Sequence, residues 1–244
     1  MANIVEVFSG IQGEGTIVGY RQLFVRFANC QLDCGYCDTD FAEKQYANIE
    51  IEPGKRNFIQ WKNPVDYNLL AEHLISMNRQ LKHHSVSLTG GEPLLNSKYL
   101  SKLLPILRSE GMKIYLETNG LLYSYLSDIV KYVDIIGMDI KLKSATNQIT
   151  NWLEHEKFLT VAKDKELFVK VVVSNKTTEN EIKHIAELLE KLETNAPLIL
   201  QPITPKRGFQ PPAPDQLLQL MEIAINCNSD VRIIPQTHIM LQQL

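Results

Sequence analysis

The chain has 244 residues, of which 44% are hydrophobic, so it can bury a substantial core, and α/β barrels of this length commonly fold as one domain. Its 25 basic and 28 acidic residues are spread without a lysine or arginine cluster, which argues against nucleic acid as a direct partner. No basic leader is seen and no apolar run approaches the ~20 residues that span a bilayer, so we expect a cytoplasmic protein without membrane contact.

Short β-rich runs alternate with amphipathic helical stretches from residue 21 onward, a pattern typical of parallel strands joined by helical crossovers. The pattern predicts six such strands, at 23–28, 86–89, 113–117, 135–140, 168–173 and 198–202, and a later extended piece at 231–235. It predicts helices at 67–79, 99–110, 179–192 and 215–225. We therefore expect an α/β fold, a partial (open) TIM-like barrel of about six parallel strands with outer helices, in a single domain over residues 1–244.

Two segments are expected to lack regular structure. Residues 41–63 are polar, contain Pro53-Gly54 and show little periodicity, so they are interpreted as a loop insert. Residues 204–214 contain four prolines and Gly208. Polar residues follow the end of each predicted strand, and the carboxyl ends of barrel strands face one cleft, so the site is expected there.

Three of the four cysteines lie close together, at Cys30, Cys34 and Cys37, directly after the first predicted strand. Such clustering is typical of a metal site in a reducing compartment, whereas a disulfide framework spreads its cysteines. Zinc would need a closed set of four ligands, usually from two separated pairs, and the sequence has no second pair. A [4Fe–4S] cluster on three thiolates instead keeps one iron open for a small molecule.

The remaining candidate ligands are interpreted as structural. The histidines are scattered, and His83-His84 is expected to be a solvated helix end. Cys227 lies in a stretch where apolar residues recur at helical spacing, so we expect it to be buried packing.

The cysteine spacing, with Tyr36 just before the last cysteine, resembles the signature of the radical S-adenosylmethionine (SAM) superfamily. The run Gly90-Gly91-Glu92-Pro93 at the next strand end resembles that superfamily's Gly-Gly-Glu-Pro motif, in which the glycines let the backbone approach the SAM ammonium and the glutamate accepts from it. The resemblance implies a [4Fe–4S] cluster on Cys30, Cys34 and Cys37, and a 5′-deoxyadenosyl radical that abstracts hydrogen from the substrate. It implies that SAM is lined by Tyr36, Cys37, Asp38, Gly91, Glu92, Asn119, Asp139, Lys141, Gln201, Pro202, Ile203 and Thr204.

Residues 8–15 together with 24–30 closely resemble the 7-carboxy-7-deazaguanine synthase family. From the residues alone, the loop 12–15 carries one amide and one carboxylate that can pair with the edges of a pterin, or it is an N-cap or solvent loop. Arg26 lies among apolar neighbours, where its guanidinium needs a carboxylate, either from the substrate or in a structural ion pair.

The family resemblance implies a substrate side at both ends of the chain, with residues 1–20 as an N-terminal extension and 227–244 as a C-terminal closing segment. The residues implied to contact substrate are Gln12, Gly13, Glu14, Arg26, Thr89, Gln236 and His238. Thr39 is implied to coordinate a Mg²⁺ that orients the substrate carboxylate, with local capping as the alternative.

The resemblance implies conversion of 6-carboxy-5,6,7,8-tetrahydropterin to 7-carboxy-7-deazaguanine with loss of ammonia, for queuosine and related nucleosides. It further implies a flavodoxin- or ferredoxin-type reductant and a homodimer. However, Asp139-Ile140-Lys141 stands where many relatives carry Ser-Pro-Lys, and it looks more like the glycyl-radical-enzyme activases. An activase acting on a partner protein and a non-enzymatic zinc-binding module therefore stay open as alternatives.

Overall fold

The computed structural model describes residues 1–37, 40–206, 208–228 and 230–243. Within them one curved sheet contains β1 (Ile4–Ile11), β2 (Arg21–Phe27), β3 (Tyr46–Glu50), β4 (Phe58–Lys62), β5 (Val86–Gly90), β6 (Ile114–Thr118), β7 (Ile135–Ile140), β8 (Glu166–Val173), β9 (Leu198–Pro202) and β10 (Val231–Ile233). Their order across the sheet is β10-β9-β8-β7-β6-β5-β2-β1-β3-β4. The neighbouring strands β2, β5, β6, β7, β8, β9 and β10 run parallel to one another, which confirms the predicted α/β partial barrel and adds β10 as a seventh parallel strand.

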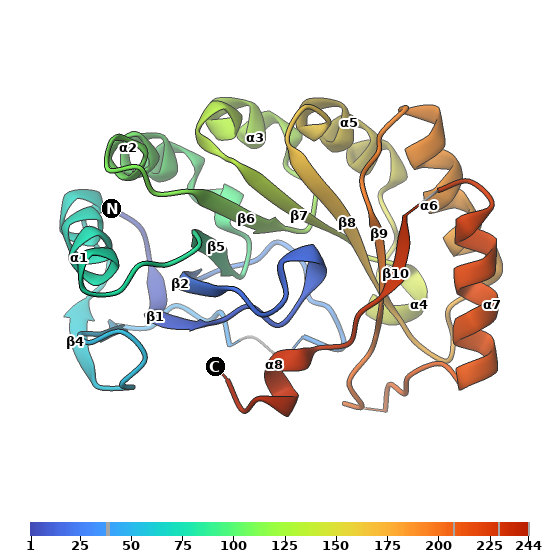
Figure 1. The fold of residues 1–244 in the computed structure, drawn as a ribbon, viewed down its shortest axis with the longest axis horizontal. Coiled ribbons are helices and arrows are strands. Elements are labelled where there is room, and N and C mark those ends of the chain that lie inside the picture. Colours follow the sequence, from blue (N-terminus) through green and yellow to red (C-terminus); the bar gives the residue numbers. More distant parts are fainter. Residues whose placement is uncertain (38–39, 207, 229, 244) are drawn as a thin grey trace.

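The longer helices cover the outer side of the sheet, as Figure 1 shows. They are α1 (Tyr67–Gln80), α2 (Ser97–Ser109), α3 (Tyr123–Ile129), α5 (Trp152–Ala162), α6 (Glu179–Lys191) and α7 (Pro214–Ile225). Two short helices, α4 (Lys143–Thr146) and α8 (Thr237–Met240), do not belong to this outer layer. The local sequence determines where two of these helices begin: Asp66 caps the N-terminus of α1, and Thr178 and Glu181 form a capping box at the N-terminus of α6. The four predicted helices are confirmed, whereas α3 and α5 were not predicted.

The central strands are buried along most of their length, between the outer helices and the interior of the barrel. Every residue of β7 is buried, and β8 is buried at six of its eight positions. The main core lies between the sheet and the outer helices, while Ile17, Tyr115, Ile135, Phe168 and Ile199 form a smaller cluster. Tyr115 and Phe168 of this cluster also line the cavity described below, so it forms the floor of the barrel interior.

The segment 41–63 is not a loop insert, and that prediction was wrong. It contains β3, which pairs parallel with β1, and β4, which pairs antiparallel with β3. Ala47 and Ile49 are fully buried on β3, whereas most of β4 is exposed as the edge strand of the sheet. Pro53-Gly54 lies in the connection between the two strands, and the exposed edge strand carries almost none of the hydrophobic alternation that would have revealed it.

Two structural interpretations of single residues also need correction. His83 is not a solvated helix end, because the residue is only 8% exposed and its Nε2 lies 2.8 Å from the Ser9 hydroxyl. Cys227 is half-buried rather than buried, because it follows the end of α7 instead of lying on the apolar face of that helix.

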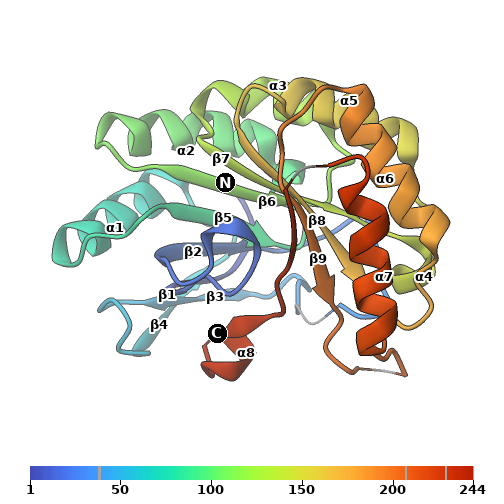
Figure 2. The same cartoon turned by 45° about the vertical axis from the view of Figure 1, so that its right-hand side comes forward.

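The two terminal segments meet at the open side of the barrel. The N-terminal segment forms β1, antiparallel to β2, and ends in the loop that contains Gly13. The C-terminal segment carries α8 across the opening, away from the outer helices (Figure 2). Thr237 donates to the Gly13 carbonyl from its backbone N–H at 3.0 Å and its hydroxyl at 3.1 Å. No helix in the described ranges combines the length and the apolar character that crossing a membrane requires.

Candidate active site

A cavity of about 680 Å³ opens at the carboxyl ends of the parallel strands. The structure brings together there most of the residues singled out from the sequence: Gln12, Gly13, Glu14, Arg26, Cys30, Cys34, Tyr36, Cys37, Thr89, Gly91, Asn119, Asp139, Lys141, Gln201, Ile203, Thr204, Gln236 and His238. Glu92 and Pro202 are not among the lining residues. Asp38 and Thr39 lie outside the described residues.

The cysteine loop is built by local backbone geometry. Asn29, two residues after the end of β2, has a left-handed backbone with φ of 68°, a conformation that asparagine tolerates better than most residues. The N–H of Cys37 then donates to the Cys34 carbonyl at 2.9 Å, which folds the loop back on itself. Burial raises the pKa of the Cys30 thiol and that of Cys34, the latter to about 11. These thiols are therefore protonated at neutral pH, and binding to a metal would release their protons.

The three cysteines of the loop border one cavity. Among the described residues, no three His, Cys, Asp or Glu side chains are grouped so that they could hold one metal ion. A [4Fe–4S] cubane takes one thiolate per iron, so its cysteines surround a volume instead of converging on a point. Cys30, Cys34 and Cys37 all line the same cavity, which provides that volume.

The glycine pair that ends β5 fits tightly against the cysteine loop. Gly90 has φ of +111°, and a Cβ added to Gly91 would lie 1.8 Å from the Asn29 carbonyl oxygen. Only glycine allows this approach. The N–H groups of Gly91 and Glu92 donate to the carbonyls of Phe27 and Asn29 at 2.9 and 2.8 Å. The motif therefore fixes the start of the cysteine loop.

Glu92 differs from the expectation that its carboxylate faces SAM. The side chain is fully buried and accepts hydrogen bonds from the Thr118 hydroxyl at 2.9 Å, the Asn119 N–H at 2.9 Å and the Leu94 N–H at 3.1 Å. Burial raises the pKa of Glu92 to about 7 despite these donors. Its carboxylate thus ties the ends of β5 and β6 together behind the wall and places Asn119 in the cavity.

A charged group lies beside the cysteine loop. The Lys141 ammonium is 2.8 Å from Asp139 Oδ2 and donates to the Tyr36 hydroxyl at 2.9 Å. Asp139 Oδ1 and Gln201 Oε1 are buried and have no hydrogen-bond partner among the described residues. Because buried acceptors are rarely left unsatisfied, these two atoms indicate a ligand that donates hydrogen bonds, such as the hydroxyl and amino groups of SAM.

A second charged group lies near the two chain termini. The Lys170 ammonium contacts both Glu14 and Asp139, and Gln236 and Gln201 donate to Glu14 Oε1 at 2.8 and 3.2 Å. Burial alone would raise the pKa of Glu14, but Lys170 outweighs burial and lowers it to about 2. Glu14 is therefore an anion that can only accept hydrogen bonds.

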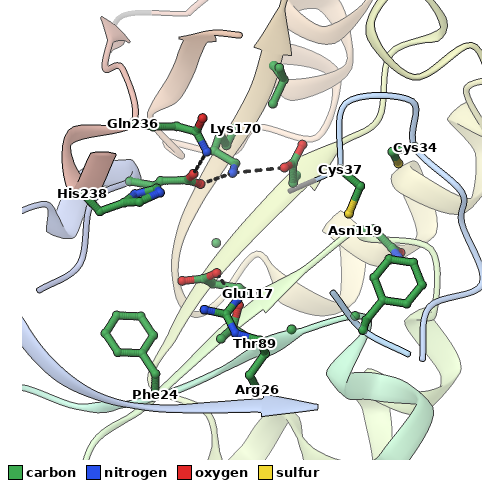
Figure 3. A pocket seen from close by; sticks show the side chains of 18 of the residues that line it. Phe24, Arg26, Cys34, Cys37, Thr89, Glu117, Asn119, Lys170, Gln236 and His238 are labelled. Atoms are coloured by element: carbon green, nitrogen blue, oxygen red, sulfur yellow. Dashed lines mark hydrogen bonds and ion pairs between the residues drawn. The ribbon is translucent and has the colours of Figure 1, made fainter. Parts of the chain in front are cut away.

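A third group of polar residues in the cavity consists of Arg26, Thr89 and Glu117, which Figure 3 shows opposite Lys170, Gln236 and His238. Arg26 forms the structural ion pair left open above, with its Nε 2.7 Å from Glu6 Oε1, while its side chain still lines the cavity. Thr89 and Gln12 each donate to the Glu117 carboxylate at 2.7 Å. This group therefore combines a cation with a carboxylate held by neutral donors.

Glu117 and Lys170 were not singled out from the sequence. Each is a charged residue within a mostly apolar strand, β6 for Glu117 and β8 for Lys170, as Arg26 is within β2. That signal, applied to every strand, would have found both residues. Their partners lie far away along the chain, so the sequence alone does not show what they contact.

Residues 24–189 match the model of the Radical SAM superfamily. Together with the partial barrel and the cysteine loop, this match defines the class of the protein, whose members use a [4Fe–4S] cluster and SAM. The structure is similar to that of QueE from Escherichia coli, with a TM-score of 0.61 at 22% identity over 97% of this chain and 94% of that one. At that identity the likeness supports the fold alone.

Relatives of known name identify the family within this superfamily. The chain is 41% identical to the 7-carboxy-7-deazaguanine synthase of Geobacter sulfurreducens, over 100% of this chain and 98% of the relative. It is 34% identical to the enzyme of that name from Methanocaldococcus jannaschii, over 90% of each chain. The chain therefore belongs to the 7-carboxy-7-deazaguanine synthase family of the radical SAM superfamily. Neither the activase nor the zinc-binding module is favoured by these findings.

Proposed function

We propose that this enzyme converts 6-carboxy-5,6,7,8-tetrahydropterin to 7-carboxy-7-deazaguanine with loss of ammonia, as a step towards queuosine and related deazapurine nucleosides. One observation carries the proposal. The three cysteines of the cluster loop line the same cavity as Gln12, Glu14 and Arg26, in a chain that matches relatives named for this product along its whole length.

The cavity divides into two halves in this proposal. The SAM half comprises Tyr36, Cys37, Gly91, Asn119, Asp139, Lys141, Gln201, Ile203 and Thr204. From the family resemblance we assign Asp38 to SAM as well. The substrate half comprises Gln12, Gly13, Glu14, Arg26, Thr89, Gln236 and His238, to which we add Glu117. When bound, the reduced cluster and SAM supply the one-electron chemistry that removes a hydrogen atom from the substrate.

The chain's own residues bind and orient the substrate. Glu14 and Glu117 are carboxylates that accept from the N–H groups of a pterin. The Gln12 amide connects their surroundings, because its Nε2 donates to the Glu117 carboxylate at 2.7 Å and its Oε1 accepts from the backbone N–H of Glu14 at 3.0 Å. The Arg26 guanidinium provides the cation for the substrate carboxylate. The C-terminal segment that crosses the opening helps to exclude water.

Further components follow from the family resemblance. We propose that Thr39 coordinates a Mg²⁺ beside the substrate carboxylate, since a hydroxyl is a suitable hard ligand. We also propose a flavodoxin- or ferredoxin-type reductant, a homodimer and a cytoplasmic location, where a reducing environment protects the thiolates.

The decisive experiment is anaerobic turnover of the reconstituted enzyme with the carboxytetrahydropterin, SAM and a reductant. We expect 7-carboxy-7-deazaguanine in the mass spectrum and no product when SAM is omitted. Slow formation of 5′-deoxyadenosine without any deazaguanine, in an enzyme with a full cluster, would refute the proposed substrate. A protein that binds zinc and no iron would refute the radical SAM chemistry.

A further inference from the structure

We propose that Lys170 couples the binding of SAM to the binding of the pterin, as a positioning residue between the two halves of the cavity. The inference rests on the proposed function, which assigns Asp139 to the SAM half and Glu14 to the substrate half. Lys170 contacts both of these carboxylates with one ammonium group.

The position of Lys170 suits this role. It lies on β8, where its neighbours along the strand are apolar, and its side chain is only 15% exposed. Its Nζ is 3.1 Å from Asp139 Oδ2 and also contacts Glu14 Oε2. Figure 3 shows Lys170 between the Gln236 and His238 side of the cavity and the cysteine loop.

Each carboxylate is held on its far side as well. Lys141 contacts the same Asp139 oxygen at 2.8 Å, and Gln236 donates to the other oxygen of Glu14 at 2.8 Å. Two carboxylates thus alternate with two ammonium groups in one continuous chain of balanced charge. A side chain cannot move within such a chain without disturbing its neighbours, because breaking one buried pair leaves a charge uncompensated.

This row of charged side chains has one unsatisfied acceptor on the SAM half of the cavity. Asp139 Oδ1 is buried without a hydrogen-bond partner among the described residues, although its Oδ2 is shared by two lysines. A donor from SAM at Oδ1 fixes Asp139, and Asp139 in turn fixes Lys170 and Glu14. The pterin then meets a carboxylate that is already ordered, so the two ligands bind with positive cooperativity.

Calorimetric titration of the anaerobic holoenzyme without reductant tests this coupling, because both ligands bind and neither is consumed. We expect saturating pterin to tighten SAM binding by about 10-fold, and SAM to tighten pterin binding by the same factor, since coupling is reciprocal. In Lys170→Met both ligands still bind, but both ratios fall to about 1. The matched control is Lys191→Met, which removes an exposed lysine paired with Glu156 at 2.6 Å and should keep the full coupling.

The outcomes separate the two proposals. Pterin binding with unchanged coupling in Lys170→Met overturns the role of Lys170 and leaves the proposed function standing. Failure of the wild-type enzyme to bind the pterin overturns both. If Lys170→Met does not fold, the charge-balanced double variant Lys170→Met/Asp139→Ser takes its place, and retained coupling there has the same meaning. Failure of both variants to fold marks Lys170 as structural and overturns the coupling.

Discussion

At the scale of single residues, a substitution in the cysteine loop should remove the chemistry and leave the fold intact. Cys34 lies in a loop at the mouth of the barrel, and two remaining thiolates do not retain a cubane. We expect Cys34→Ala to lose the cluster and SAM cleavage while its circular dichroism spectrum stays that of the wild type. Iron and sulfide analysis checks the loss.

Cys227→Ala is the matched control for this loss. It removes the half-buried cysteine beyond α7 and should cost about 1 kcal/mol of stability at most, with no iron lost. Wild-type SAM cleavage in reconstituted Cys34→Ala would contradict the cluster assignment.

Arg26 tests the substrate assignment, because SAM cleavage does not itself require it. Arg26→Ala removes the charge-assisted partner of the substrate carboxylate and should weaken pterin binding by about 2 to 4 kcal/mol, measured by titration of the cluster-loaded enzyme. Because Arg26 also pairs with Glu6, Glu6→Gln provides the control: it breaks the ion pair and keeps the guanidinium. If Glu6→Gln weakens pterin binding as much as Arg26→Ala does, the arginine acts through the ion pair instead.

At the scale of elements, the pairing of β3 with β4 can be tested against the alternative that residues 46–62 form a loop. Ile49 on β3 is fully buried, and its register partner Ile59 on β4 is 43% exposed. We expect Ile49→Ala to lower the free energy of unfolding by about 2 to 4 kcal/mol and Ile59→Ala to change it by less than about 0.5 kcal/mol. Denaturant titration measures both. Equal, small effects would mean that residues 46–62 do not pack as part of the sheet.

At the scale of the whole molecule, buried histidines give stability a pH dependence. Burial, helped by the charge of Arg21, lowers the pKa of His83 from its ordinary 6.5 to about 4, and burial lowers that of His155 in the same way. The unfolded chain then binds more protons between these pH values, so the free energy of unfolding should fall as the pH drops from about 6.5 to about 4.

Substitution of His83 tests the sign of this effect. Urea unfolding of His83→Asn should show a smaller loss of stability between pH 7 and pH 5 than the wild type shows. His184→Asn, which removes an exposed histidine on α6, should keep the wild-type loss. A wild-type pH dependence in His83→Asn would show that this histidine does not contribute.

The sequence by itself determined the parallel strands, the cysteine loop and about half of the residues that line the cavity. These features depend on local information: apolar runs of strand length, three cysteines in one short loop, and polar residues at the ends of strands. A barrel places the carboxyl ends of all its parallel strands at one edge, so these polar residues lie together. The segment that the sequence did not reveal includes the short edge strand β4, in which four of five residues are exposed and only Trp61 is partly buried, so almost no burial pattern is left in the sequence.

Only the tertiary structure decided which partner each charged residue has. Glu92 is spaced from the glycine pair as in a SAM-binding motif, yet three donors of the chain itself occupy its carboxylate. Arg26 and Lys170 look alike in sequence, each a cation within an apolar strand, but one pairs with Glu6 and the other joins Glu14 to Asp139. A burial pattern records that a side chain faces the interior, whereas the energy of a buried charge depends on atoms within a few ångströms that come from distant parts of the chain.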